Sequence, residues 1–88
     1  MIEFKSTVNN KIGLHLRAAG EFVKLASQYE SNVLVIKHGK KANGKSILGL
    51  ASLAVGRGSE ITIQVDGDDE AAAKEAIEQL ISDNFYEE

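Results

Sequence analysis

The chain of 88 residues contains no cysteine, no proline and only two histidines. Without cysteine it cannot form a disulfide or a thiolate metal site, which suits a reducing cytoplasm. The apolar residues never form the run of about 18 residues that a membrane span needs, and the N-terminus lacks the apolar core of a signal peptide. We therefore expect one cytoplasmic domain over residues 1–88, with no metal site and no membrane insertion.

Charge is distributed unevenly along the chain, although its sum is only -3. Residues 1–59 hold nine basic and three acidic side chains, whereas residues 60–88 hold one basic and ten acidic ones. A basic region attracts acidic proteins, nucleic acid or phosphate groups. Aromatic residues make up only 6% of the chain and no arginine-rich stripe accompanies them, so we do not expect a nucleic-acid surface.

Hydrophobic periods of two and of 3.6 residues predict seven elements in the order β-α-β-β-α-β-α. Strands are expected over residues 2–8, 33–37, 40–43 and 61–65. Helices are expected from Leu16 to just beyond Tyr29, over residues 47–55, and from residue 68 onward. His38-Gly39 is predicted to form a two-residue hairpin turn, because glycine and, less readily, histidine tolerate positive φ.

The stretch GKKANGKS, from Gly39 to Ser46, matches the nucleotide-binding pattern G-x-x-x-x-G-K-[ST]. The chain around it does not fit that function. The following strand, ITIQV, alternates apolar and polar residues, whereas the strands of a parallel nucleotide-binding sheet are apolar throughout. The helix after the motif is short, and 88 residues supply too few strands for a doubly wound sheet. Nucleotide binding is the disfavoured alternative, and Ser46 is predicted to be a helix N-cap.

His15 lies in the stretch IGLHLRAAG and is expected at or beside the N-cap of the first helix. A helix N-terminus has unpaired backbone N–H groups and the positive end of the dipole, so it holds anions. Arg17, two residues later, adds a cation that suits phosphate oxygens. These features fit a phosphoryl group on the His15 ring, and they fit equally well a histidine that only caps the helix.

The segment GLHLRAAGEFVKLAS resembles the active-site segment of the HPr family, the histidine-containing phosphocarriers of the bacterial phosphoenolpyruvate-dependent phosphotransferase system, in which the pattern is G-L-H-A-R-P-A. The segment NGKSILGLASLAVGRGSE resembles the same family, and the similarity extends over nearly all of the chain. The resemblance implies an α+β open-faced β-sandwich, with three helices on one face of a four-stranded antiparallel sheet. It also implies a monomeric carrier that is not itself an enzyme and uses no cofactor.

By this resemblance, His15 accepts a phosphoryl group on Nδ1 from enzyme I and passes it to an enzyme IIA component for sugar uptake. Arg17 resembles the arginine that attends the phosphohistidine. Ser46 resembles the serine that an ATP-dependent HPr kinase/phosphorylase modifies in many bacteria. A plain N-cap is the alternative for Ser46, and the two roles are compatible.

The same resemblance suggests a docking surface for the partner proteins on the first two helices. Its expected residues are Leu16, Gly20, Lys24, Lys45, Ile47, Leu48 and Gly49. Together with Arg17 they would form an apolar patch with positive charge at its rim, as in a transient protein contact. The alternative is that some of them, Leu48 especially, belong to the core.

Three positions near His15 depart from the family pattern: Ile12 where threonine or serine is common, Leu16 where alanine is usual, and Ala18 in place of proline. These departures leave the choice of partner open. One alternative is a paralogue in a regulatory, nitrogen-related phosphorelay. Another is a regulatory binding module that acts through Ser46 while His15 is silent.

Overall fold

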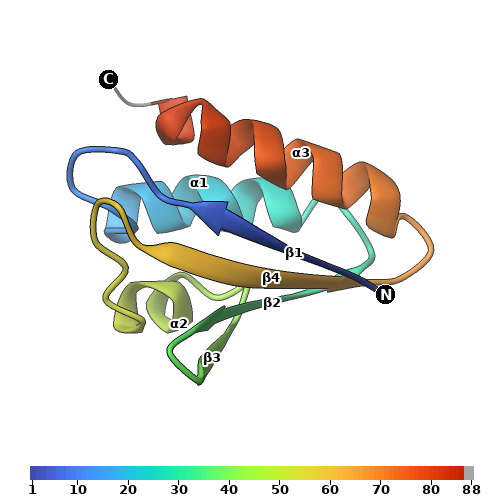
Figure 1. The fold of residues 1–88 in the computed structure, drawn as a ribbon. Coiled ribbons are helices and arrows are strands. Elements are labelled where there is room, and N and C mark those ends of the chain that lie inside the picture. The colour runs from blue at the N-terminus through green and yellow to red at the C-terminus, as the bar shows by residue number, and fades with distance from the viewer. Residues whose placement is uncertain (87–88) are drawn as a thin grey trace.

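The computed structural model describes residues 1–86 and has four strands and three helices in the predicted order (Figure 1). The strands are β1 (Ile2–Thr7), β2 (Asn32–Lys37), β3 (Lys40–Asn43) and β4 (Glu60–Asp66). The helices are α1 (Leu16–Ala26), α2 (Ile47–Ser52) and α3 (Glu70–Ser82), followed by a short 3₁₀ turn, η1 (Asn84–Tyr86).

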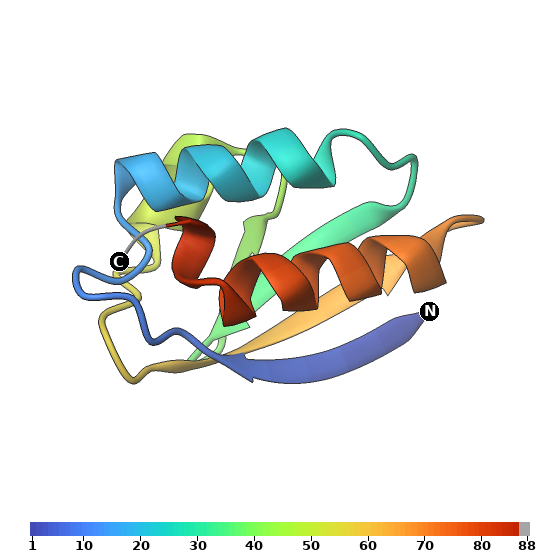
Figure 2. The same cartoon turned by 90° about the horizontal axis from the view of Figure 1, so that it is seen from above.

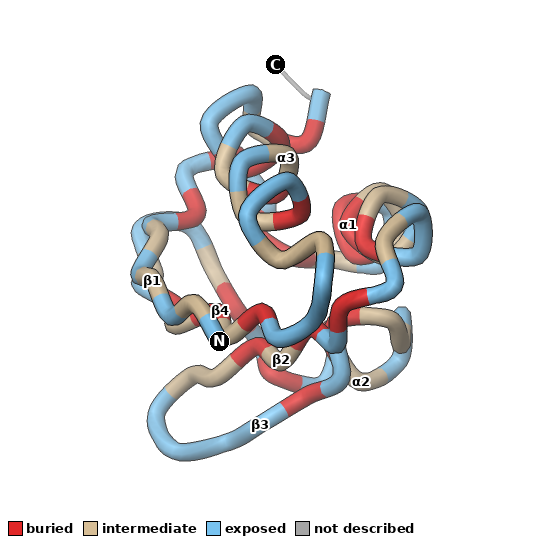
Figure 3. Tube along the Cα trace, turned by 90° about the vertical axis from the view of Figure 1, so that its right-hand side faces the viewer, coloured by how far each residue is buried: buried red, intermediate tan, exposed pale blue. Residues whose placement is uncertain are grey.

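The four strands form one antiparallel sheet in the order β1-β4-β2-β3. Side chains of β2 and β4 alternate between a buried and a more exposed face, because successive residues of a strand point to opposite sides. The helices cover the buried face, and α1 and α3 lie side by side across it (Figure 2). Within residues 1–86 the helices gather on this side, and none lies over the opposite face of the sheet (Figure 3). The predicted open-faced sandwich is therefore confirmed.

The core lies between the sheet and the helices. Phe22 of α1, Ile77 of α3 and Phe85 of η1 are almost completely buried there, together with the inward-facing residues of β2 and β4. The final turn was not predicted. Phe85 has φ of +57°, a left-handed conformation that sequence periodicity does not reveal, and it closes the end of the core.

The hairpin between β2 and β3 confirms the predicted two-residue turn. His38 and Gly39 both have positive φ, at +48° and +78°, as a type I′ turn requires. Gly39 therefore belongs to a hairpin, and the four residues after it form β3 rather than a phosphate-binding loop. This arrangement excludes the P-loop interpretation of GKKANGKS.

The first helix is shorter than expected. α1 ends at Ala26, whereas the hydrophobic period predicted helix as far as Tyr29. After Ser27 the backbone tightens, because the N–H of Gln28 bonds to Leu25 O and the N–H of Tyr29 bonds to Ala26 O. Tyr29 still packs against the core, so its apolar position was predicted correctly although its secondary structure was not.

The second helix also ends early, at Ser52 rather than at Val55. Ala54 has φ of +54°, which ends the helix, and two carbonyl groups then point to neighbouring segments. Ala54 O accepts a bond from Lys37 Nζ at 2.6 Å, and Val55 O accepts one from Leu14 N at 2.8 Å. These tertiary bonds satisfy two carbonyl groups that would have no helical partner at the end of the predicted helix.

Candidate functional site

His15 is the N-cap of α1, as predicted. Its backbone is extended, with φ of -78° and ψ of -178°, and its Nδ1 accepts a hydrogen bond from the backbone N–H of Arg17 at 3.3 Å. This bond satisfies one of the free N–H groups of the first turn. An Nδ1 atom that accepts a hydrogen bond carries its lone pair, so the neutral ring has its proton on Nε2. The ring is partly exposed.

A rigid turn precedes His15. The side-chain amide of Asn10 donates to Gly13 O at 2.6 Å, and the N–H of Gly13 bonds back to Asn10 O at 3.2 Å. Gly13 has φ of +81°, and a Cβ atom at this position would overlap Val55 O. The turn is thus packed against the segment that follows α2, and this contact fixes where α1 and its N-cap begin.

The immediate neighbours of His15 combine an exposed cation with an exposed apolar side chain. Arg17 is exposed in the first turn of α1, and Leu16 is 60% exposed. No acidic side chain lies in this first turn. Ala18, where the family pattern has proline, is fully buried. An anion at His15 therefore meets a cation and the helix N-terminus without a nearby carboxylate in that turn.

Ser46 is the N-cap of α2, as predicted. Its Oγ accepts a hydrogen bond from the backbone N–H of Gly49 at 3.1 Å. A Cβ atom on Gly49 would lie 3.1 Å from the same Oγ, so the small residue keeps this cap open. The neighbouring Lys45 is tied down, because its Nζ donates to Tyr29 O at 2.8 Å.

The expected docking residues lie on two helices that contact each other. Of the three large apolar ones, Leu48 is 77% exposed, so it does not belong to the core; Leu16 and Ile47 are also exposed. Lys24 is exposed on α1, and Gly20 and Gly49 are half-buried. Arg17 is at the start of α1 and Lys45 lies just beyond its end, so the two cations are separated by a helix of roughly 16 Å. They border opposite ends of the surface.

Two exposed residues beside the site were not assigned to the docking surface from the sequence. Ile12 is 68% exposed in the turn before His15, and Arg57 is exposed in the loop that packs against this turn. The sequence did contain one local indication of an exposed role for Ile12: it is an aliphatic residue within the short polar stretch NNKIG. Arg57 comes close to the turn before His15 only through the tertiary fold, so no local sequence pattern indicates its position.

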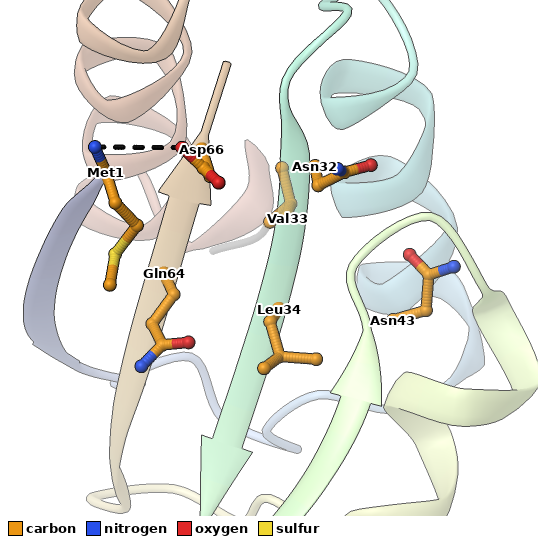
Figure 4. A pocket seen from close by; sticks show the side chains of 7 residues that line it. All are labelled: Met1, Asn32, Val33, Leu34, Asn43, Gln64 and Asp66. Carbon is orange, nitrogen blue, oxygen red and sulfur yellow. Dashed lines mark ion pairs between the residues drawn. The ribbon is translucent and has the colours of Figure 1, made fainter.

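A depression of about 520 Å³ opens on the uncovered face of the sheet (Figure 4). Leu34, Asn43 and Gln64 line it from three neighbouring strands, and no residue of α1 or α2 contributes to it. His15 therefore lies outside this depression.

Over residues 1–86, no three histidine, aspartate or glutamate side chains are grouped so that they could hold a metal ion. In the same part of the chain, no helix has both the length and the hydropathy that a membrane crossing requires.

The fold and the site define a class of protein: a small open-faced sandwich that presents a partly exposed histidine at a helix N-terminus, where an anionic group is stabilised. The family model for the HPr component of the phosphotransferase system, which describes its phosphorylation site, matches residues 2–83. The chain belongs to the HPr family and has its general role, that of a phosphocarrier in the phosphotransferase system.

Individual relatives match most or all of the chain. The phosphocarrier protein HPr of Xylella fastidiosa strain Temecula1 is 39% identical over 88 residues, which cover 100% of this chain and 99% of the relative. The HPr-like protein Crh of Halalkalibacterium halodurans is 47% identical over 77 residues, or 88% and 92% of the two chains. The crystal structure of HPr-C-His from Thermoanaerobacter tengcongensis superposes with a TM-score of 0.95 at 43% identity, covering 100% and 99%.

The predicted monomer is not confirmed by these comparisons. A crystal structure of an HPr dimer from Thermoanaerobacter tengcongensis matches with a TM-score of 0.79 at 42% identity and covers 99% of this chain and 100% of that one.

Proposed function

We propose that His15 is the phosphoryl-accepting residue of this phosphocarrier and that enzyme I is the donor. The observation that carries the proposal is the position of His15 Nδ1 at the N-cap of α1, where it accepts the N–H of Arg17. A nucleophilic nitrogen needs an available lone pair, and the helix terminus favours the negative charge that a phosphoryl group brings.

In the proposed step, the Nδ1 lone pair of His15 forms a bond to phosphorus as the bond between phosphorus and the donor breaks. The electron pair of that bond returns to the donor, and Nε2 keeps its proton. The N–H of Arg17, released from Nδ1, then donates to a phosphoryl oxygen, while the Arg17 guanidinium adds a charge-assisted contact.

Transfer onward to an enzyme IIA component reverses this step with a different nucleophile. An exposed helix terminus stabilises a charge by only about 0.3–1 kcal/mol, so it holds the phosphoryl group without trapping it. The chain therefore acts as a carrier between two enzymes, and we assign it to sugar uptake. The proposed partners dock on α1 and α2 through the exposed Leu16, Ile47 and Leu48.

Phosphorus NMR tests the donor step directly. The protein is incubated with phosphoenolpyruvate, magnesium and a catalytic amount of a bacterial enzyme I. We expect an acid-labile phosphohistidine signal that is absent from the His15→Ala variant and present in His38→Ala, which removes the other histidine. A signal that survives in His15→Ala would overturn the assignment.

The choice between sugar uptake and a nitrogen-related relay is tested by competition. The protein is offered a sugar-branch enzyme I and its nitrogen-branch paralogue in separate labelling reactions. We expect the larger second-order rate with the sugar-branch enzyme; the opposite order would assign the chain to the regulatory relay.

We further propose that Ser46 accepts a phosphate from an ATP-dependent HPr kinase/phosphorylase. Its hydroxyl is partly exposed at the start of α2, and a phosphate there would remain next to the free N–H groups of the helix. Incubation with the kinase and ATP should give an acid-stable phosphoserine that Ser46→Ala lacks. No phosphoserine in the wild-type protein would overturn this role.

A second candidate is a regulatory binding module that acts through Ser46, and the similarity to Crh of Bacillus subtilis, described as a catabolite repression HPr, favours a regulatory role. The two labelling experiments distinguish the candidates. Phosphoserine without any phosphohistidine would favour the regulatory module, and phosphohistidine at His15 would favour the carrier.

A further inference from the structure

We infer that Lys11, Ile12 and Arg57 form a second docking surface, here called the loop surface, and that Ile12 contributes to binding the acidic partner protein that phosphorylates His15. The loop surface lies beside the N-terminus of α1 and is separate from the helix surface described above. The inference rests on the proposed function of His15, because the partner in question is a protein that transfers a phosphoryl group to or from this residue.

Ile12 is held in an exposed position. It is 68% exposed, and it occupies the turn that the two Asn10–Gly13 hydrogen bonds close. Gly13 is buried against the segment after α2, so the turn has little freedom to fold Ile12 onto the core. A large aliphatic side chain in a rigid, exposed turn contributes nothing to core packing, but it can fill a recess in a partner without a large ordering cost.

Arg57 is held with similar rigidity. The N–H of Gly58 bonds to Val8 O at 2.7 Å, the N–H of Val8 bonds to Ser59 O at 2.9 Å, and the N–H of Ser59 closes the turn on Gly56 O. Gly58 has φ of +84°, which suits glycine. The loop that carries Arg57 is therefore joined by hydrogen bonds to the start of the loop that carries Ile12.

The two loops also touch at Gly13 and Gly56. A Cβ atom on Gly13 would lie 2.8 Å from the Cα of Gly56, so the backbones are in van der Waals contact. This contact places the residue after Gly56, Arg57, on the same rigid unit as Ile12. Neither Lys11 nor Arg57 forms an ion pair within residues 1–86, and both are exposed.

The apolar and positively charged side chains of the loop surface indicate which kind of partner it binds. An exposed aliphatic residue with two exposed cations on the same pair of loops fits an acidic protein surface with an apolar recess. Ile12 is three residues before His15, so a protein whose reactive group reaches His15 Nδ1 must also approach Ile12. We therefore assign the loop surface to the phosphoryl-exchanging partner rather than to a second copy of this chain.

The test compares the wild-type protein with Ile12→Thr, which keeps the branch at Cβ and replaces the ethyl group by a hydroxyl, and with Arg57→Gln. Tyr86→Asn, which tolerates the positive φ of this position, and Lys40→Gln are the controls. Tyr86 is also 68% exposed, and Lys40 is an exposed cation in the β2–β3 hairpin. The readout is the rate at which enzyme I labels His15, measured over a range of protein and salt concentrations.

We expect Ile12→Thr to raise the KM for phosphorylation by five-fold or more while kcat changes little. Arg57→Gln should raise the KM and also reduce its dependence on salt, because one attractive charge is lost. Both controls should stay within two-fold of the wild-type KM. Urea unfolding of each variant should give wild-type stability, since surface substitutions rarely change it by more than about 0.5 kcal/mol.

Three results would overturn the inference. An unchanged KM in Ile12→Thr, with His15 labelled normally, would show that the loop surface is not a docking site, and it would leave the carrier function in place. A concentration-dependent dimer of the wild-type protein that Ile12→Thr dissociates would show that a second copy covers this surface. Failure of wild-type labelling would overturn the proposed function, and the loop surface with it.

Discussion

His15 and Ser46 are both helix N-caps, and the side chain of each accepts a hydrogen bond from a backbone N–H of the first turn. Both positions could be predicted from the sequence, because an N-cap depends on a polar residue followed directly by an apolar helical period. The fixed turn before His15 could not be predicted in the same way. It depends on Gly13 meeting Val55 O, a contact between residues 42 positions apart.

Replacement of Ser46 by alanine should lower the free energy of unfolding by about 0.5–2 kcal/mol, because the N–H of Gly49 loses its acceptor. Urea unfolding at pH 7 measures the change. Ser46→Asp should restore most of it, since aspartate is also a good N-cap. Ser52→Ala is the control, because this exposed serine bonds only to Gly49 O within its own helix, and it should change stability by less than about 0.5 kcal/mol.

Two glycine-to-alanine substitutions should have opposite effects. At Gly13, with positive φ and no room beside Val55 O, alanine should destabilise the protein by more than about 1 kcal/mol. At Gly20, in α1 with nothing within 4 Å of the added atom, alanine should stabilise it by roughly 0.5–1 kcal/mol. Thermal unfolding measures both, and a stabilised Gly13→Ala protein would contradict the fixed turn.

At the scale of elements, the order and type of all seven strands and helices could be predicted, but some ends could not. The hydrophobic period of α2 continues to residue 55, yet the helix stops at Ser52, and Ala54 O and Val55 O bond to other segments. Helix ends depend in part on which tertiary donors are available to the last carbonyl groups. Such partners are distant in sequence, so periodicity carries no information about them.

The junction between α1 and β2 depends on a carboxylate from the start of α3. Asp69 accepts hydrogen bonds from the hydroxyl of Ser31 and from the backbone N–H groups of Glu30 and Ser31, at 2.9 and 3.0 Å. Gly67 supports the contact, because a Cβ atom there would lie 2.6 Å from Ser31.

These bonds predict an acid-sensitive contribution to stability. The Ser31 hydroxyl and then the Glu30 N–H hold the pKa of Asp69 below its ordinary value of 3.8. Because the folded pKa is lower, the contribution is complete above pH 3.8 and is lost as the pH falls through the folded pKa. Urea unfolding between pH 6 and pH 2 should show stability falling in the acid part of this range.

Asp69→Asn should be less stable than the wild-type protein at pH 7 and should lose less stability on acidification. Asp68→Asn is the matched control, since this exposed neighbour does not hold the junction between α1 and β2. The control should keep the wild-type pH dependence. If Asp69→Asn showed the full acid-dependent loss, the junction would not depend on the Asp69 carboxylate.

At the scale of the whole molecule, the uneven charge of the sequence becomes a spatial separation. α3, which carries much of the acidic segment, packs on one side of α1, whereas α2 packs on the other (Figures 1 and 3). The exposed cations Arg17 and Lys24 lie on α1, and Arg57 lies in the loop after α2. The docking surfaces therefore have a positive rim even though the net charge of the chain is -3.

This separation predicts that phosphorylation by enzyme I becomes slower as salt rises. Attraction between a positive rim and an acidic partner is screened over about 10 Å at 0.1 M salt and over about 3 Å at 1 M. The second-order labelling rate should fall several-fold over this range. Lys24→Gln should lower the rate at low salt, whereas Glu75→Gln, an equal loss of charge on α3, should change it by less than two-fold. If both variants changed the rate equally and in opposite directions, net charge rather than its placement would control the encounter.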